Sequence, residues 1–217
     1  MTKPPRCFLD KILRNSVLTF VLFLGAIVPS RASNLAIRLG LWHLTNADFS
    51  TDSALQTNRQ KNYMYVEAAL ENRLAPPVSF DVSLGTLFRG TTRYQTTSGE
   101  RFVGTANVLP MSVGFSFYPF PFAGVEPYLR IGGTAALGNQ NSGNFSGFDA
   151  SGNPVFNSKT RFTAGFFGGA GFKYKLFTKV DLLTEFSYHQ LKFSGPIAGI
   201  SNHSGYKILA GVSINYK

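Results

Sequence analysis

The sequence has few of the residues on which metal proteins and many enzymes depend. Its one cysteine, Cys7, lies near the start, so the rest of the chain has no disulfide, thiolate metal site or thiol nucleophile. The three histidines, His43, His189 and His203, stand in no His-x-Glu or His-Glu-x-x-His pattern, and we expect no metal site. No P-loop or Gly-x-Ser-x-Gly motif occurs either, so we expect no cofactor and no enzyme of those classes.

Charged residues are also scarce, at 15% of the chain. The net charge is +10, but part of it belongs to the first 32 residues, which have five basic residues and one acid: Lys3, Arg6, Lys11, Arg14, Arg31 and Asp10. Subtracting this +4 from +10 leaves +6 for the remainder. No run of lysine and arginine forms a phosphate-binding patch, and we expect no nucleic-acid partner.

The chain lacks an apolar run long enough for a transmembrane helix. The longest is Val17–Val28, which is shorter than the roughly 20 residues that a spanning helix needs. Basic residues precede it, Pro29 ends it, and Ser30 and Ala32 provide small side chains for cleavage. This pattern predicts a secretory signal peptide over residues 1–32, removed on export through the inner membrane. An uncleaved N-terminal anchor is the alternative.

The last stretch, Tyr206–Lys217, has a different pattern. Every second residue is apolar or aromatic: Tyr206, Ile208, Ala210, Val212, Ile214 and Tyr216. A period of two indicates a strand with two unlike faces, and a tilted strand of about 9–11 residues crosses a bilayer. An aromatic residue stands at each end of the apolar face, where a membrane–water interface would lie. The alternative is a half-buried strand of a soluble sandwich.

Seven further segments alternate in the same way. With the last stretch, the predicted strands are Leu35–Leu44, Asn62–Asn72, Val78–Arg89, Val103–Tyr118, Gly124–Leu137, Thr160–Tyr174, Lys179–Phe193 and Tyr206–Lys217. A helix is an alternative for Val66–Leu74, because Glu-Ala-Ala-Leu-Glu favours one. Pro110 cannot donate to a strand ladder, so we expect a bulge there, or a membrane-embedded part that starts only near it.

The connections between these segments alternate in length. Long polar loops are expected at 45–61, 90–102, 138–159 and 194–203, with 138–159 the longest, and short turns at 74–77, 118–122 and 176–178. Outer-membrane barrels have short periplasmic turns and long extracellular loops in this order. We therefore expect an all-β fold, an eight-stranded antiparallel up-and-down transmembrane β-barrel over residues 33–217, preceded by the signal peptide.

Charged residues of the predicted strands gather on the less apolar face. They are six basic and five acidic residues: Arg38, Arg89, Arg130, Arg161, Lys173, Lys207, Glu67, Glu71, Asp81, Asp181 and Glu185. An arginine or lysine facing lipid at mid-bilayer would cost about 2–4 kcal/mol, whereas inward charges can pair. We expect an interior network centred on Arg38, Glu67, Asp81, Arg130 and Glu185. Solvated charges on a soluble sheet are the alternative.

Inward positions on the fourth to sixth strands are small: Ser112, Gly114, Ser116, Gly132, Thr134, Gly165, Gly169 and Gly171. They leave a cavity or make room for rings from other strands, namely Trp42, Tyr65 and Tyr128. We expect filling, because the interior of an eight-stranded barrel is just wide enough for side chains.

The C-terminal strand and the loop alternation resemble the small bacterial outer-membrane β-barrel families that include proteins A and W, although Lys217 follows the aromatic residue that ends the family pattern. The resemblance implies a monomeric, porin-like barrel in the Gram-negative outer membrane, in contact with lipid and lipopolysaccharide. It also implies recognition of the last strand by the barrel-assembly machinery. The expected function is non-enzymatic, structural or exerted through extracellular loops. The alternative is a passage for small hydrophobic molecules, as in W-like barrels.

His189 and the segment Asn202-His203-Ser204-Gly205 resemble a second family, the outer-membrane lipid A deacylases. That family has a His-x-Ser pair on the seventh strand and a glutamate shortly after the glycine. Here Leu191 stands in place of the serine and Lys207 in place of the glutamate. Without the nucleophile, acyl transfer by that route is not expected, and His189 is interpreted as a packed or capping residue.

Overall fold

The computed structural model describes residues 33–48, 55–56, 61–95, 101–148, 154–197 and 199–216. The predicted signal peptide, including Cys7, lies outside the described residues. Every helix or strand in the described part is a β-strand. Within these ranges, no helix has the length and apolar character needed to cross a membrane.

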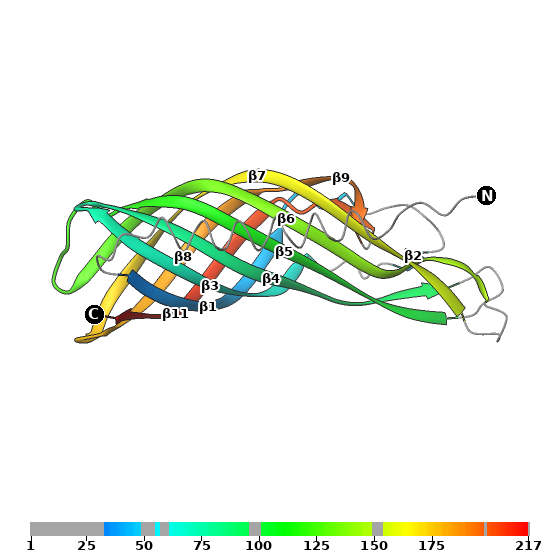
Figure 1. Cartoon of the computed structure of the whole chain (residues 1–217), viewed down its shortest axis with the longest axis horizontal. Coiled ribbons are helices and arrows are strands. Elements are labelled where there is room, and N and C mark those ends of the chain that lie inside the picture. Colours follow the sequence, from blue (N-terminus) through cyan, green and yellow to red (C-terminus); the bar gives the residue numbers. More distant parts are fainter. Residues whose placement is uncertain are drawn as a thin grey trace. The chain divides into compact units, whose positions relative to one another are not determined.

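Eight long strands form a closed antiparallel barrel (Figure 1). They are β1 (Ser33–Leu44), β3 (Asn62–Ala75), β4 (Val78–Gln95), β5 (Arg101–Phe117), β6 (Val125–Phe148), β7 (Pro154–Phe177), β8 (Val180–Gln190) and β11 (Gly205–Tyr216). Each pairs with its neighbour, and β1 pairs with both β3 and β11, which closes the barrel. The predicted all-β barrel is confirmed, and the helical alternative for residues 66–74 is wrong, since this segment lies in β3.

The two ends of the barrel differ in their connections. Short turns join β3 to β4, β5 to β6 and β7 to β8. Ser33 pairs with Tyr216, so β1 begins and β11 ends at the same end of the barrel as these turns. We call this the periplasmic end, following the orientation of outer-membrane barrels, and the opposite end the extracellular end. The extracellular end includes three short strands, β2 (Leu55–Gln56), β9 (Lys192–Ile197) and β10 (Ile200–Asn202).

Three of the four loops predicted on the extracellular side, 90–102, 138–159 and 194–203, contain long stretches of strand. Strands β6 and β7 continue through most of 138–159, β4 continues to Gln95, and β5 already begins at Arg101. Residues 192–202 form the β9–β10 hairpin. The extensions of β4 to β7 project beyond the ends of β1, β8 and β11 (Figure 1). The predicted boundaries were wrong here because neither face of a strand in water has to be apolar, so the alternating pattern stops before the backbone pairing does.

The bulge predicted at Pro110 is not where the ladder shifts. Pro110 pairs with Ala136 in a continuous β5–β6 register. On the other side of β5, the register with β4 changes only between Phe88 and Thr91. The missing donor of Pro110 is therefore accommodated without a change of register.

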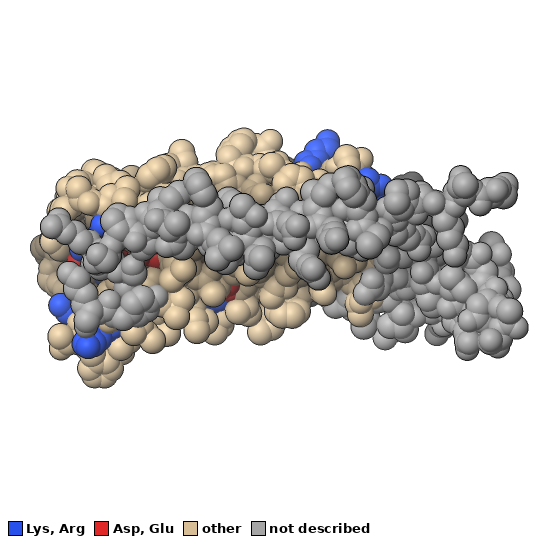
Figure 2. Space-filling model, in the orientation of Figure 1, with Lys and Arg blue, Asp and Glu red and all other residues tan. Residues whose placement is uncertain are grey.

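The outer wall of the barrel is apolar and its interior is charged. Leu39 is 58% exposed and Ile208 is 61% exposed, whereas Arg38 is 3% and Glu185 is 2% exposed. In the view of Figure 2, most of the described wall is neither acidic nor basic. A water-soluble fold has the opposite arrangement, so this wall is suited to lipid.

Candidate functional site

The centre of the barrel interior holds a network of paired charges. Arg38 of β1 lies directly opposite Glu67 of β3 in the strand register. Its Nη1 donates to Glu67 Oε1 at 2.8 Å and to Glu185 Oε2 at 3.1 Å. One guanidinium thus joins carboxylates from β3 and β8, which are not neighbouring strands.

Arg130 of β6 joins the other carboxylates. Its Nη1 donates to both oxygens of Glu185, at 3.2 and 3.1 Å. Its Nε donates to Asp81 Oδ1 at 2.8 Å, and Nη2 is bonded to the same oxygen. The guanidinium also lies 4.8 Å from the centroid of the Phe167 ring. Such charge-assisted bonds are stronger than neutral ones and hold both partners in one geometry.

Lys207 completes the network from β11. Its Nζ lies 3.2 Å from Glu67 Oε2, which also accepts a hydrogen bond from the Tyr65 hydroxyl at 2.9 Å. The cluster therefore contains three cations and three carboxylates: Arg38, Arg130, Lys207, Glu67, Asp81 and Glu185. All six side chains are buried, and this balance is what makes their burial tolerable.

The structure places all five residues of the predicted network in this one cluster. Sequence reasoning put Lys207 on the same face but did not place it in the cluster. It also missed Phe167, which has the inward parity of Thr163 and Gly171 but was hidden among glycines and next to the lipid-facing Phe166. Strand parity is the signal that could have found both.

Aromatic rings occupy the space above the small inward residues. A Cβ added at Gly85 would overlap the Tyr65 hydroxyl, and one at Gly171 would overlap the Tyr128 ring. At Gly132 the added atom would meet the Phe167 ring at 2.8 Å. These glycines are therefore the sites that receive the rings, and this part of the interior is filled.

A second polar level lies on the extracellular side of the network. His189 stacks on Phe167 with ring centroids 4.9 Å apart and packs against Trp42 at 5.0 Å. Its Nδ1 lies 3.3 Å from the Thr134 hydroxyl, which is in turn 2.9 Å from the Ser112 hydroxyl. His189 is 1% exposed and faces the barrel interior rather than the lipid.

An apolar layer lies on the extracellular side of the His189 level. It combines barrel residues with residues of the β9–β10 hairpin and its flanks: Trp42, Leu44, Tyr63, Tyr65, Leu87, Ala106, Val108, Ala136, Leu191, Phe193, Ile197, Ile200 and Leu209. The hairpin packs its side chains onto the inner wall, since a Cβ at Gly138 would lie 2.7 Å from Ile197 Cγ1. The hairpin therefore occupies part of the barrel interior at the extracellular end.

Asp48 fastens this hairpin to the end of β1. Its Oδ1 accepts the backbone N–H groups of Ser201 at 3.1 Å and Asn202 at 2.8 Å, and its Oδ2 accepts the Ser201 hydroxyl. Burial raises the pKa of the Asp48 carboxyl, but these donors outweigh it and leave the pKa below its ordinary value of 3.8. Asp48 is thus held as a carboxylate that accepts from the hairpin at neutral pH.

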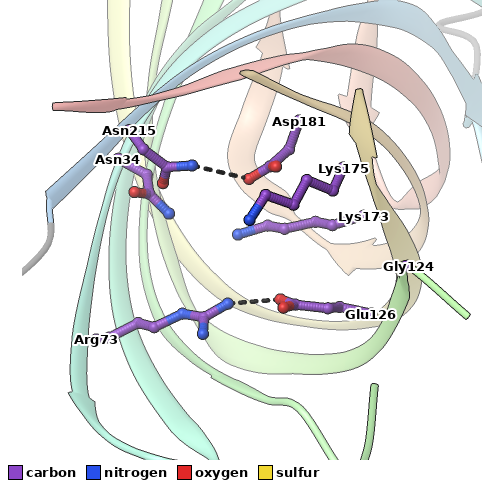
Figure 3. Close-up of a pocket in the computed structure, with 8 residues that line it drawn as sticks. All are labelled: Asn34, Arg73, Gly124, Glu126, Lys173, Lys175, Asp181 and Asn215. Carbon is purple, nitrogen blue, oxygen red and sulfur yellow. Dashed lines mark hydrogen bonds and ion pairs between the residues drawn. The ribbon is translucent and has the colours of Figure 1, made fainter. Parts of the chain in front are cut away.

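The periplasmic mouth forms an open polar pocket of about 220 Å³ (Figure 3). Its eight lining residues come from β1, β3, β6, β7, β8, β11 and the turn before β6: Asn34, Arg73, Gly124, Glu126, Lys173, Lys175, Asp181 and Asn215. On its inner side, Lys173 pairs with Glu71, which also accepts the Tyr118 hydroxyl at 2.5 Å and the Ser79 hydroxyl at 2.9 Å.

The remaining charges predicted to face inward are more peripheral. Arg161 is half-buried and donates to the Ser194 hydroxyl at 3.3 Å. Asp181 is half-buried at the periplasmic mouth and accepts from Asn215 at 3.2 Å. The side chain of Arg89 lies outside the described residues. In the part of the chain that the structure describes, no group of three His, Asp or Glu side chains is arranged to hold a metal ion.

Comparisons with known proteins agree with this architecture. Three solved structures of similar fold are Neisserial surface protein A (16% identity, covering 85% of this chain and 97% of that one, TM-score 0.52), OprG from Pseudomonas aeruginosa (14%, 86% and 97%, 0.52) and a major outer membrane protein from Thermus thermophilus (11%, 85% and 99%, 0.51). At these identities the likeness concerns the fold alone. No curated protein sequence matches the chain. Residues 16–216 match the family described as "Outer membrane protein beta-barrel domain", and the chain therefore belongs to this family of outer-membrane β-barrels.

Proposed function

We propose that this protein is a non-enzymatic outer-membrane barrel that acts as a structural element of the membrane and through its extracellular end. The observation that carries the proposal is the filled interior. From the periplasmic side outward, the described interior consists of the Lys173–Glu71 pair, the six-charge network, the His189 level and the apolar layer. Each level joins side chains from several strands, so opening a passage would require all of them to rearrange.

The remaining parts of the proposal concern processing and surroundings. Residues 1–32 act as a cleaved signal peptide, and residues 33–217 form the mature, monomeric barrel. The apolar wall contacts outer-membrane lipid and lipopolysaccharide, and the last strand is recognised by the barrel-assembly machinery. The pairing of β11 with both β8 and β1 supports this role, because β11 is the strand that closes the barrel.

Two observations argue against catalysis on lipid A. His189 lies inside the barrel, stacked on Phe167, so lipid substrates on the outer wall do not reach it. Leu191 and Lys207, which replace the serine and glutamate of the deacylases, are buried as well. Mass spectrometry of lipid A from cells with and without the protein tests this point, and the expected spectra are identical.

A passage for hydrophobic molecules has less support from the geometry. The apolar layer where such a molecule would bind is occupied by Phe193, Ile197 and Ile200 of the chain's own hairpin. Uptake of a hydrophobic dye into liposomes containing the protein is therefore expected to equal uptake into protein-free liposomes.

Conductance measurements test the filled interior directly. The purified protein, after its folding has been checked by the shift between unheated and boiled samples on a gel, is inserted into planar lipid bilayers, with a known pore-forming outer-membrane protein as the positive control for the recording. We expect no stable conductance steps from this protein. Reproducible steps in the folded protein would contradict the proposal.

A further inference from the structure

The pocket at the periplasmic mouth has a charge arrangement that the filled interior does not require. Two of the cations that line it are used in ion pairs. Arg73 Nη2 is 2.5 Å from Glu126 Oε2 across the mouth, and Lys173 pairs with the buried Glu71. Within the described residues, no ion pair includes the two other charged lining residues, Lys175 and Asp181.

Lys175 and Asp181 are direct partners in the β7–β8 register, yet their side chains do not pair. Asp181 is held instead by the Asn215 amide at 3.2 Å. The side chains of Lys173 and Lys175 both extend from β7 into the mouth (Figure 3). The pocket therefore presents one ammonium and one carboxylate, close together in the fold, that have no ionic partner among the residues the structure describes.

The overall charge of the mouth selects the kind of ligand. With Glu71 included, three cations (Arg73, Lys173, Lys175) face three carboxylates (Glu71, Glu126, Asp181). A polyanion would meet the carboxylates and a polycation the ammonium groups, so like-charge repulsion disfavours both. A ligand with one positive and one negative group would satisfy Lys175 and Asp181 together.

The size of the pocket is consistent with a small ligand. Its volume of about 220 Å³ is below the roughly 300–1,000 Å³ of sites for drug-sized molecules. It is about seven times the volume of one liquid water, about 30 Å³, so a compact ionic group fits. The buried Asn34 amide and Lys173 ammonium give the pocket a fixed polar wall.

We propose that the periplasmic mouth is a binding site for a small zwitterion, namely the free ammonium-and-carboxylate group of an amino acid or of a peptide end. The ligand carboxylate contacts Lys175 and its ammonium contacts Asp181. This site is separate from the filled interior, so it can fail without affecting the proposed structural function, and the reverse also holds.

NMR titration of the full barrel in lipid nanodiscs tests the proposal. The probes are L-alanine, N-acetylalanine, which lacks the cation, and alaninamide, which lacks the anion. Amide signals at the mouth, including those of Lys175 and Asp181, are expected to shift and saturate with alanine in the millimolar range. The two single-charge probes are each expected to bind at least about tenfold more weakly than alanine.

Variants separate a specific site from general ionic attraction. Lys175→Ala and Asp181→Asn are each expected to weaken alanine binding at least about tenfold, whereas Lys192→Ala, a matched exposed lysine on β9, leaves it unchanged. The exchanged pair Lys175→Asp with Asp181→Lys is expected to recover part of the affinity. Equal shifts from all three probes, shifts that do not saturate, or binding that survives both single substitutions would each overturn the proposal. Preserved spectra away from the mouth show that the variants are folded.

Discussion

Arg130 forms ion pairs in the buried interior, whereas Arg73 forms one at the exposed periplasmic mouth. Replacing each arginine by alanine is therefore expected to lower the free energy of unfolding by different amounts. Arg130 is buried between Asp81 and Glu185, so Arg130→Ala leaves two buried carboxylates without their main partner. Removing one member of a buried pair costs about 3–5 kcal/mol. We expect a loss of this size in urea-induced unfolding in lipid vesicles, followed by the fluorescence of Trp42, the one tryptophan of the chain.

The control for this measurement is Arg73→Ala. Arg73 pairs with Glu126 at the periplasmic mouth, where the two side chains are 43% and 37% exposed. Exposed pairs contribute about 0–1 kcal/mol, because water and salt screen them and side-chain entropy opposes them. Equal losses from the two substitutions would show that the central network does not stabilise the barrel in the manner described.

Glycines of the inner and outer faces provide a second test at the scale of one residue. Gly85→Ala places a methyl group where the Tyr65 hydroxyl lies, and overpacking of this kind costs about 1–3 kcal/mol. Gly133 faces outward, and the nearest atom to an added Cβ is 3.8 Å away. Gly133→Ala is therefore expected to change the free energy of unfolding by less than about 0.5 kcal/mol in the same vesicle assay.

The sequence allowed the facing of single residues to be predicted better than their contacts. Period-two alternation assigned Arg38 and Glu185 to the interior, because a lipid-facing charge is costly. It did not show that Phe167 fills the space over Gly114 and Gly132, since that depends on strands far apart in the sequence. Which ring occupies which glycine site follows from the register of the closed barrel, which alternation alone does not specify.

At the scale of an element, the β9–β10 hairpin depends on Asp48 for its attachment to the end of β1. The folded pKa of Asp48 is below 3.8, so the stabilisation by its hydrogen bonds is complete above that pH and is lost as the pH falls through the lowered value. We expect the NMR chemical shifts of the Ser201 and Asn202 amide protons to follow the titration of Asp48, with a midpoint below pH 3.8.

Two variants check the assignment of this titration. Asp48→Asn is expected to remove it while keeping an acceptor oxygen, and Asp181→Asn at the opposite end is expected to leave it unchanged. A midpoint at or above 3.8 in the unmodified protein would mean that the carboxylate does not hold the hairpin.

At the same scale, the sequence did not show how far some strands extend. Inside the membrane, lipid on one side and the packed interior on the other impose alternation, and the predicted strands match the structure there. Beyond Leu137, β6 continues to Phe148 and stays paired with β7, although the apolar alternation has stopped. Glycine, asparagine and serine in that segment were therefore interpreted as a loop.

For the whole molecule, the reversed distribution of polarity changes what a surface substitution costs. Leu39 is 58% exposed and lies near the middle of β1, which spans the barrel from Ser33 to Leu44. On a water-soluble protein, replacing such a residue by lysine usually changes stability by less than about 0.5 kcal/mol. Here Leu39→Lys places a charge in lipid, and we expect a loss of about 2–4 kcal/mol.

The matched substitution is Phe122→Lys. Phe122 is 74% exposed, but it lies in the turn between β5 and β6 at the periplasmic end, where a lysine reaches water. The expected loss there is about 0–1 kcal/mol. Leu39→Lys should therefore lower the free energy of unfolding in vesicles more than Phe122→Lys does, although Phe122 is the more exposed residue. In detergent micelles of reduced thickness the difference should shrink, because water then approaches the middle of β1. If both lysines were tolerated equally in a bilayer of normal thickness, the wall around Leu39 would not face hydrocarbon, and the membrane-spanning arrangement would have to be abandoned.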